Sequence, residues 1–328
     1  MSRAGSLRIL VVGAGHMGVL HARKLVALAA EGFDVELAGV ADLDADRARA
    51  LGGALGVAWA SDHRELLAHA EAAIVAVPTV AHYGVVMDAL KAGLHVLVEK
   101  PIAASLAEAE ALLATARGEG RLLQVGHLER FNTALRRVAD SIREPRFIEA
   151  HRLGPFAARA TDVDVVRDVM IHDLDIILQL VGEEPDRIEA VGVPVISGKL
   201  DIANARLTFP NGCVANVTAS RVSPTPLRKL RVFQPDAYFS IDFLEQRAAI
   251  FTRSGPPGDV ASIQIEPLDL DREDALDQEL RAFAIAVRTH GRPPLAPEEA
   301  MRALRTALRI TEAIRRGPAA GSASGASA

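Results

Sequence analysis

Residues 7–18 have the sequence LRILVVGAGHMG, a short apolar run followed by three glycines with the spacing G-x-G-x-x-G. The run Leu7–Val12 is typical of a buried strand, and the residues after the glycines have the apolar spacing of a helix. In this context Gly13 permits a tight turn, Gly15 lets the backbone approach a pyrophosphate, and Gly18 lets the helix pack on the strand. The stretch predicts the first β–α unit of a dinucleotide-binding domain.

An acidic residue follows the second expected strand, Glu36–Ala41. Asp42 lies 24 residues after Gly18, where a carboxylate accepts hydrogen bonds from a ribose 2′-hydroxyl and repels a 2′-phosphate. The sequence therefore favours NAD over NADP. Arg47 could offset the acid and keeps NADP open as the less favoured cofactor. The alternative is a glycine turn beside an incidental aspartate.

The sequence up to residue 125 alternates between apolar runs and segments of helical spacing. Strands separated by helices pair in parallel through right-handed crossovers, which predicts an α/β fold with a doubly wound parallel sheet, a Rossmann domain over residues 1–125. The expected strands are Leu7–Val12, Glu36–Ala41, Ala73–Val77, His95–Val98 and Leu122–Val125, and the expected helices are His16–Ala30, Ala45–Leu55, Asp62–Ala70, His82–Ala92 and Ser105–Arg117.

The pattern changes after residue 126, where strand-like runs follow one another, with Asn211-Gly212 as a hairpin turn. Residues 126–316 are predicted to form an α+β domain with a largely antiparallel open sheet, one face of which helices cover. The tail 317–328 contains only Gly, Pro, Ala and Ser and is expected to be disordered. The expected strands are Arg187–Val193, Asp201–Phe209, Cys213–Ser220, Leu227–Phe233, Ala237–Phe243 and Ala248–Thr252, and the expected helices are Asp168–Val181, Ala275–Thr289 and Pro297–Arg316.

Composition excludes several classes of protein. The 328 residues include 37 Lys and Arg against 42 Asp and Glu, a net charge of −5, so nucleic-acid binding is not expected. Cys213 is the single cysteine, which rules out an intramolecular disulfide and a thiolate zinc site. No apolar run reaches the ~18 residues of a membrane helix. We expect a cytoplasmic protein without a resident metal.

Two further strand ends carry polar residues at the edge where such sheets bind ligands. Pro78 and Thr79 follow one strand, with His82 close behind, and Glu99 and Lys100 close the next. A lysine at the end of a hydrophobic strand is the stronger signal. Pro78 as a plain strand terminator and His82 as a surface residue are the alternatives.

The expected helix 168–181 is apolar except for one narrow stripe and for Asp173, an acid in the apolar arc that the pattern does not explain. On a regular helix Asp168, His172, Asp175 and Gln179 fall on one face. A carboxylate one turn from a histidine raises its basicity and holds its tautomer. With a nicotinamide site and Lys100, this pair suits transfer of hydride from an alcohol, because a base must take the hydroxyl proton. A solvated helix face and a metal site are the alternatives.

These motifs together resemble the Gfo/Idh/MocA oxidoreductase family from about Leu7 to Arg316. The resemblance implies that Lys100, Asp168 and His172 form a catalytic trio. In it the histidine accepts the proton, the aspartate orients the histidine, and the lysine contacts substrate hydroxyl and cofactor. The implied cofactor-binding residues are Gly13, Gly15, His16, Met17, Gly18, Asp42, Pro78, Thr79, His82, Glu99 and Lys100.

Four short segments are similar to those of family members that oxidise the 3-hydroxyl of UDP-N-acetylglucosamine. These segments are residues 124–132, 152–156, 170–175 and 226–231. The product of that oxidation can feed the synthesis of amide-linked lipid A. A diphosphate would need local guanidinium groups, because the protein is acidic overall. Arg130, Arg152 and Arg221 are predicted to bind substrate together with Lys100, Asp168 and His172, although any single arginine could instead form a surface salt bridge.

Other functions stay open at this point. A dehydrogenase or reductase of inositol or a free sugar needs the same catalytic groups, and a regulator that senses NAD(P) without turnover could use the same fold. An open sheet invites packing of identical copies, so a homo-oligomer, either a dimer or a tetramer, is expected.

Overall fold

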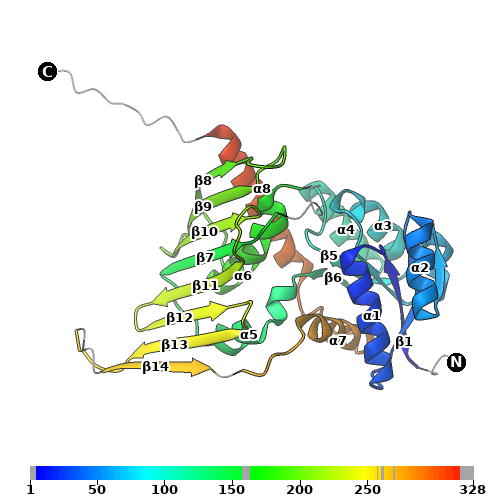
Figure 1. Ribbon diagram of the computed structural model, residues 1–328, viewed down its shortest axis with the longest axis horizontal. Coiled ribbons are helices and arrows are strands. Elements are labelled where there is room, and N and C mark those ends of the chain that lie inside the picture. Colours follow the sequence, from blue (N-terminus) through cyan, green and yellow to red (C-terminus); the bar gives the residue numbers. More distant parts are fainter. Residues whose placement is uncertain (1–4, 157–162, 257, 260–261, 269, 318–328) are drawn as a thin grey trace. The chain divides into compact units, whose positions relative to one another are not determined.

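The computed structural model describes residues 5–156, 163–256, 258–259, 262–268 and 270–317. The chain divides into two compact units (Figure 1). The first consists of residues 1–133 and 271–301, and the second of residues 134–270 and 302–328. Most of the tail that was expected to be disordered, from residue 318 onward, lies outside the described residues.

The first unit contains a six-stranded, all-parallel sheet with the order β3-β2-β1-β4-β5-β6. This order reverses direction at β1, as in doubly wound sheets, and confirms the predicted fold class. Ligands bind such sheets at the carboxyl ends of the strands near this reversal. The strands are β1 (Leu7–Val12), β2 (Val35–Ala41), β3 (Ala58–Ala60), β4 (Ala72–Val75), β5 (His95–Glu99) and β6 (Leu123–Gly126).

Helices connect these strands, and one predicted helix is absent. In place of a helix over residues 62–70, the structure has two 3₁₀ turns, His63–Glu65 and Leu67–His69. The Asp62 side chain accepts a hydrogen bond from the Arg64 amide at 2.9 Å, a local bond that competes with regular helix. The helices are α1 (His16–Ala30), α2 (Ala45–Leu55), α3 (Thr79–Lys91) and α4 (Leu106–Gly118), and a 3₁₀ turn, η3 (Leu128–Phe131), follows β6.

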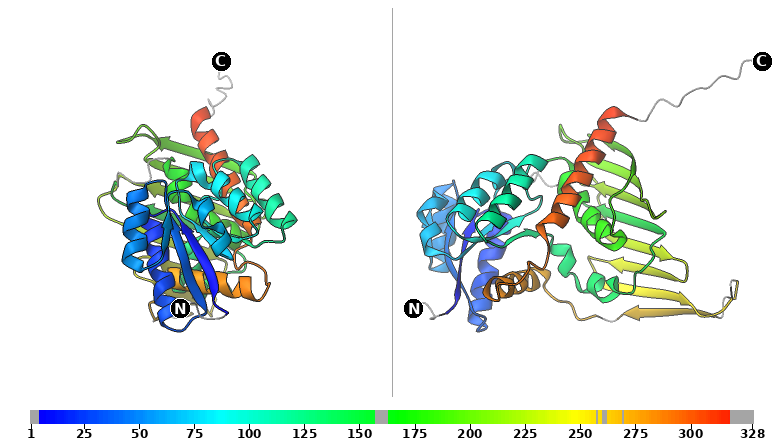
Figure 2. Two further views of the ribbon diagram at one scale, coloured as in Figure 1. Left: turned by 90° about the vertical axis from the view of Figure 1, so that its right-hand side faces the viewer. Right: turned by 180° about the vertical axis from the view of Figure 1, so that it is seen from behind.

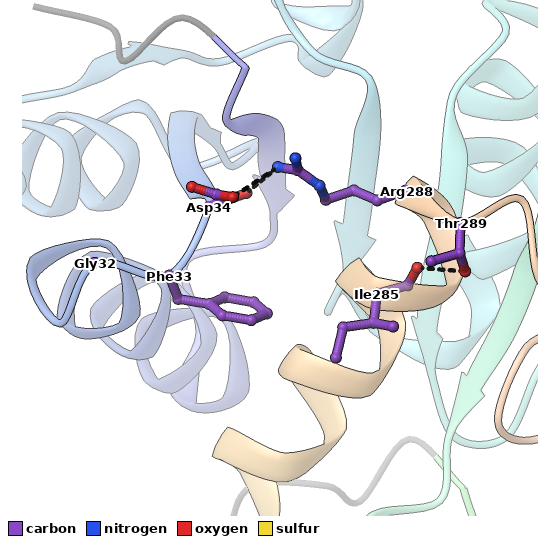
Figure 3. Close-up of a pocket in the computed structure, with 6 residues that line it drawn as sticks. All are labelled: Gly32, Phe33, Asp34, Ile285, Arg288 and Thr289. Carbon is purple, nitrogen blue, oxygen red and sulfur yellow. Dashed lines mark hydrogen bonds and ion pairs between the residues drawn. The ribbon is translucent and has the colours of Figure 1, made fainter.

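A late helix, α7 (Ala275–Arg288), belongs to the first unit. Sequence analysis gave it to the second domain. Its apolar side chains, including Phe283, join the core formed by α1 and the sheet. At its end Arg288 donates to the Asp34 carbonyl oxygen at 3.3 Å and pairs with the Asp34 carboxylate at 3.5 Å (Figure 3). Burial of this apolar face draws a distant segment back to the N-terminal sheet.

The second unit contains an eight-stranded sheet with the order β14-β13-β12-β11-β7-β10-β9-β8. Only β7 and β10 pair in parallel, so the predicted largely antiparallel sheet is confirmed. β7 and β14 were not predicted. The strands are β7 (Phe147–Leu153), β8 (Arg187–Val193), β9 (Ile202–Thr208), β10 (Val214–Ser220), β11 (Leu227–Gln234), β12 (Ala237–Asp242), β13 (Arg247–Arg253) and β14 (Ile263–Leu268).

Helices lie on one face of this sheet (Figure 2). They are α5 (Thr133–Ala139), which sequence analysis missed, α6 (Ile171–Val181), and residues 302–316 of α8 (Pro297–Arg316). All three contribute to the buried core of this unit. No helix among the described residues is long and apolar enough to cross a bilayer.

Four aromatic side chains stack in one cross-strand row on the face opposite these helices. Phe233 lies between Phe147, with ring centroids 5.8 Å apart, and Tyr238, at 4.5 Å, and Tyr238 stacks on Phe251 at 4.8 Å. The row follows the strand register, in which these residues are direct partners. Direct cross-strand aromatic pairs stabilise neighbouring strands.

Candidate active site

The β1–α1 loop needs glycine for two different reasons. Gly13 has φ +104°, and a Cβ there would lie 2.3 Å from the Ala76 carbonyl oxygen. A Cβ on Gly18 would lie 1.7 Å from the Gly13 carbonyl oxygen. At Gly15, by contrast, a Cβ would meet no atom within 4 Å. The first and third glycines thus serve the packing of the protein, and the second leaves open space beside the loop.

Helix α1 starts directly in this loop. Gly15 is its N-cap and supplies no side-chain hydrogen bond, and His16 and Met17 form its first turn. Amides of an uncapped first turn, together with the helix dipole, favour an anion. The open space at Gly15 and these amides fit the pyrophosphate of NAD.

Asp42 lies at the end of β2, next to this loop. Its Oδ2 accepts a hydrogen bond from the Ala14 amide at 2.6 Å, and its Oδ1 accepts one from the Asp44 amide at 2.8 Å. A carboxylate has about four lone-pair sites, so two remain for ribose hydroxyls. Arg47 pairs with Asp44 at 3.2 Å, so the structure gives this arginine a carboxylate partner other than Asp42.

Asp42→Ala is expected to relax cofactor selectivity toward NADP, because it removes the charge that repels a 2′-phosphate. The measurement is the ratio of affinities for NAD and NADP by fluorescence titration. Asp46→Ala is the matched control, since this exposed carboxylate lies nearby on α2 and pairs with Arg49. A wild-type preference for NADP of tenfold, equivalent to about 1.4 kcal/mol, would contradict the role of Asp42.

The turns after β4 and β5 are tied together by a buried histidine. His82 is fully buried, with Nδ1 2.8 Å from the Pro101 carbonyl oxygen and Nε2 2.9 Å from the Val77 carbonyl oxygen. The alternative of a surface residue is wrong for His82. Thr79, in the first turn of α3, is also buried. This bridge fixes Pro101, the residue after Lys100, relative to the turn at residues 77–79.

Glu99, the residue before Lys100, is anchored by a group that sequence analysis missed. Its Oε1 lies 2.8 Å from Nε2 of His21, a fully buried side chain of α1. Burial raises the pKa of Glu99, but the hydrogen bond and charge of His21, with the charges of Lys100 and His82, hold it below its usual value. Glu99 is therefore an anion at the carboxyl edge of the sheet.

In the second unit, the predicted helix 168–181 begins with a turn of π-helix, Val166–Met170, before α6. The π-turn changes the phase between Asp168 and His172, both half-buried, relative to the regular helix assumed from the sequence. Asp175 is buried and Gln179 exposed, so the predicted polar stripe is not uniformly solvated. Short π-turns occur often at functional sites.

Two of the predicted substrate arginines form internal ion pairs. Arg152 donates from Nε and Nη2 to the two carboxylate oxygens of Asp173 at 3.0 and 2.8 Å, and both side chains are buried. Arg130 pairs with Glu299 at 3.1 Å and is 6% exposed. Each contact is a structural ion pair that holds the guanidinium group in place.

Arg221 is held by the buried carboxylate of Asp201. Its Nε donates to Asp201 at 2.9 Å, and its other nitrogens donate to the Val163 carbonyl oxygen at 3.1 Å and to the Ser197 hydroxyl at 3.0 Å. Asp201 is fully buried and also accepts hydrogen bonds from three successive amides, residues 195–197. Burial raises the pKa of Asp201, and these hydrogen bonds lower it well below its usual range.

Other concave places lie away from these residues. A cavity of about 260 Å³ is lined by residues 32–34 and by Ile285, Arg288 and Thr289 of the α7 end (Figure 3). Residues 32–34 precede β2, so this cavity lies at the opposite edge of the sheet from the glycine loop. No group of three or more His, Cys, Asp or Glu within the described ranges could hold a metal ion.

Comparison with known proteins agrees with this geometry. Residues 7–127 match the model of an oxidoreductase family with an NAD-binding Rossmann fold, and residues 134–239 match the C-terminal domain of the same Gfo/Idh/MocA family. The chain is 38% identical over 311 residues, 94% of this chain and 97% of the other, to a UDP-N-acetylglucosamine 3-dehydrogenase of Acidithiobacillus ferrooxidans.

Other comparisons extend the similarity. A solved structure of a UDP-N-acetylglucosamine 3-dehydrogenase from that organism has a TM-score of 0.88 and 37% identity, and the match covers 95% of this chain and 98% of the other. A scyllo-inositol 2-dehydrogenase (NAD(+)) of Bacillus subtilis is 28% identical over 331 residues, 95% of each chain. With both domains matched and the glycine loop built to accept the cofactor, this chain belongs to the Gfo/Idh/MocA family of NAD-binding oxidoreductases.

Proposed function

We propose that this protein oxidises the 3-hydroxyl group of UDP-N-acetylglucosamine with NAD as the hydride acceptor. The observation that carries the proposal is the 38% identity to an enzyme of that name over nearly the whole of both chains. The proposed place in metabolism is a nucleotide-sugar route in the cytoplasm whose ketone product is aminated, as precursors of amide-linked lipid A are.

Bound NAD supplies the acceptor for the hydride that leaves the carbinol carbon. In the first unit, Lys100 stabilises the oxygen as negative charge develops on it. In the second unit, His172 accepts the hydroxyl proton, and Asp168 holds one ring nitrogen as a donor so that the other is free to accept. One hydride and one proton leave the alcohol, and a ketone results.

The diphosphate of the substrate carries two negative charges, for which the proposal assigns Arg130, Arg152 and Arg221. Their bonds to Glu299, Asp173 and Asp201 fix the planes of the guanidinium groups, and a fixed plane favours two parallel bonds to phosphate oxygens. All three arginines are therefore proposed to contact the substrate. Loss of such a contact would raise KM for the nucleotide sugar.

A coupled assay tests the substrate. Oxidation of an alcohol by NAD is uphill at neutral pH, so the protein is incubated with UDP-N-acetylglucosamine, NAD, glutamate and a nucleotide-sugar aminotransferase. A 3-amino nucleotide sugar is expected, detected by mass spectrometry together with NADH. A reaction without the protein is the control. Absence of the amino product, with NADH formed from inositol or free glucose, would overturn the proposed substrate.

The second candidate is a dehydrogenase of inositol or a free sugar. It is supported by the 28% identity to a scyllo-inositol 2-dehydrogenase over 95% of both chains. A regulator that only senses NAD(P) is less favoured, because Lys100 and His172 of the proposed catalytic trio are both present.

We also propose that identical copies associate through the face of the eight-stranded sheet that carries Phe147, Phe233, Tyr238 and Phe251. The aromatic side chains are partly exposed on that face, and such surfaces mark interaction sites. The expected assembly is a dimer or a tetramer.

A further inference from the structure

A glutamate lies in the apolar face of α7. Glu279 is 1% exposed and is flanked on the helix by Leu276, Leu280 and Phe283, which are core residues. Its Oε1 is buried and, among the described residues, has no hydrogen-bond partner. An ionised carboxylate in such a place costs several kcal/mol, so the group is expected to stay neutral.

Glu279 and Glu99 belong to the same unit, and the charge of Glu99 acts on Glu279. Burial, and then the negative charge of Glu99, raise the pKa of Glu279 well above its usual value. Glu99, in turn, is held as the anion by its 2.8 Å contact with His21. Two carboxyl groups in one buried region cannot both ionise without a large cost, and the contacts decide which of the two keeps the proton.

Two cations on the elements that pack against α7 are already paired with other carboxylates. Lys24 of α1 lies 2.6 Å from Asp274, and Arg130 of η3 lies 3.1 Å from Glu299. The other ionisable groups on these elements are His16, His21 and the exposed Arg23 on α1, Glu129 on η3 and the neighbouring His127. Neither of the paired cations is therefore available to Glu279 without breaking a bond.

Further buried polar atoms lie in the same part of the unit. Both amide atoms of Gln124, and Nδ1 of His21, are buried and lack a hydrogen-bond partner among the described residues. Gln124 lies on β6, two residues before Gly126, the direct partner of Glu99 in the sheet. Residues two apart on a strand share a face, so Gln124 and Glu99 lie on the same side of the sheet.

We propose that Glu279 carries a proton at neutral pH while Glu99 is ionised, so that the buried face of α7 adds no second negative charge to the part of the unit in which the His21–Glu99 pair holds the strand end that carries Lys100. If Glu279 also ionised, the core of this unit would hold a second buried anion. The charge at the strand end that carries Lys100 would then change. The protonation of Glu279 is a property of the apoprotein and does not depend on the identity of the sugar.

Infrared spectroscopy of the wild-type protein tests the protonation directly. The carbonyl stretch of a protonated carboxylic acid is expected at pH 7 and is expected to disappear in Glu279→Gln. In Glu99→Gln the band should be lost at a lower pH than in the wild type, because the neighbouring charge is gone. Absence of the band in the wild type at pH 7 would overturn the proposal, and this measurement does not require any variant to fold.

The pH dependence of unfolding gives a second test. An acid whose pKa is higher in the folded state binds a proton that the unfolded chain releases, so stability falls as pH rises from the unfolded pKa of ~4.3 toward the folded pKa. Relative to Glu279→Gln, the unfolding equilibrium constant of the wild type should therefore rise by up to about tenfold per pH unit.

Urea unfolding of both proteins between pH 5 and pH 8 measures this ratio. Glu110→Gln is the matched control, because Glu110 is an exposed glutamate on α4 of the same unit. The ratio of the unfolding equilibrium constants of the wild type and this control should not change with pH. The proposal would be overturned if the ratio for Glu279→Gln were equally independent of pH. Neither test uses turnover, so failure here is distinct from failure of the proposed substrate.

Discussion

His172→Ala is expected to lower the rate of hydride transfer by ~10²–10⁴-fold, the usual contribution of a general base. The affinity for NAD should be nearly unchanged, because the glycine loop and Asp42 belong to the first unit and His172 to the second. Single-turnover formation of NADH, with NAD affinity measured by fluorescence, separates the two effects. Asp168→Asn should cost less than His172→Ala if the aspartate only orients the ring.

His69→Ala is the matched control for this prediction. His69 is an exposed histidine of the first unit, and its loss should leave both the rate and the affinity unchanged. An unchanged rate of hydride transfer in His172→Ala would remove that residue from the mechanism and leave Lys100 as the proton acceptor.

Asp173→Ala is expected to lower the free energy of unfolding by about 3–5 kcal/mol, because it removes the buried carboxylate that pairs with the buried Arg152 guanidinium. Both side chains of the pair are 5% exposed or less. The double variant Arg152→Met, Asp173→Leu should recover much of the loss, since it removes both charges together. Urea unfolding of the single and double variants measures the two effects.

The exposed pair of Arg187 and Glu189 supplies the matched control. These side chains are 73% and 54% exposed, and Glu189→Ala should cost less than about 1 kcal/mol. An equally small loss in Asp173→Ala would contradict the structural role of the pair. KM of the folded double variant for the nucleotide sugar then tests the proposed contact between Arg152 and phosphate.

Local patterns in the sequence were sufficient for the parts of the fold that depend on neighbouring residues. The strand at residues 7–12, the helix at 16–30 and the glycine spacing were all predicted, as was the helix at 297–316. These elements have regular apolar periodicity or glycines that the turn itself requires. The order of strands and helices then restricts the first sheet to a parallel, doubly wound one.

The assignment of α7 to the first unit required the tertiary structure. Periodicity predicted the helix and its apolar face, but it does not say which core that face joins. Glu279 was visible as a glutamate within the apolar spacing of that helix. The raised pKa of Glu279 follows first from its burial and then from the charge of Glu99, 180 residues earlier in the sequence, and both depend on the packing of the chain.

Strand β7 illustrates most clearly the difference between what local sequence patterns predict and what the packed fold adds. Its inward-facing positions are Ile148, Ala150 and Arg152, and an arginine at such a position breaks the alternation that predicts a strand. Burial of that arginine is tolerated because Asp173 of α6, itself an unexplained acid on an apolar helix face, meets it with two hydrogen bonds. Local spacing along the chain is enough to locate the apolar faces of the helices and strands. The compensation of buried charges depends on the packed fold, because each partner lies on a different element.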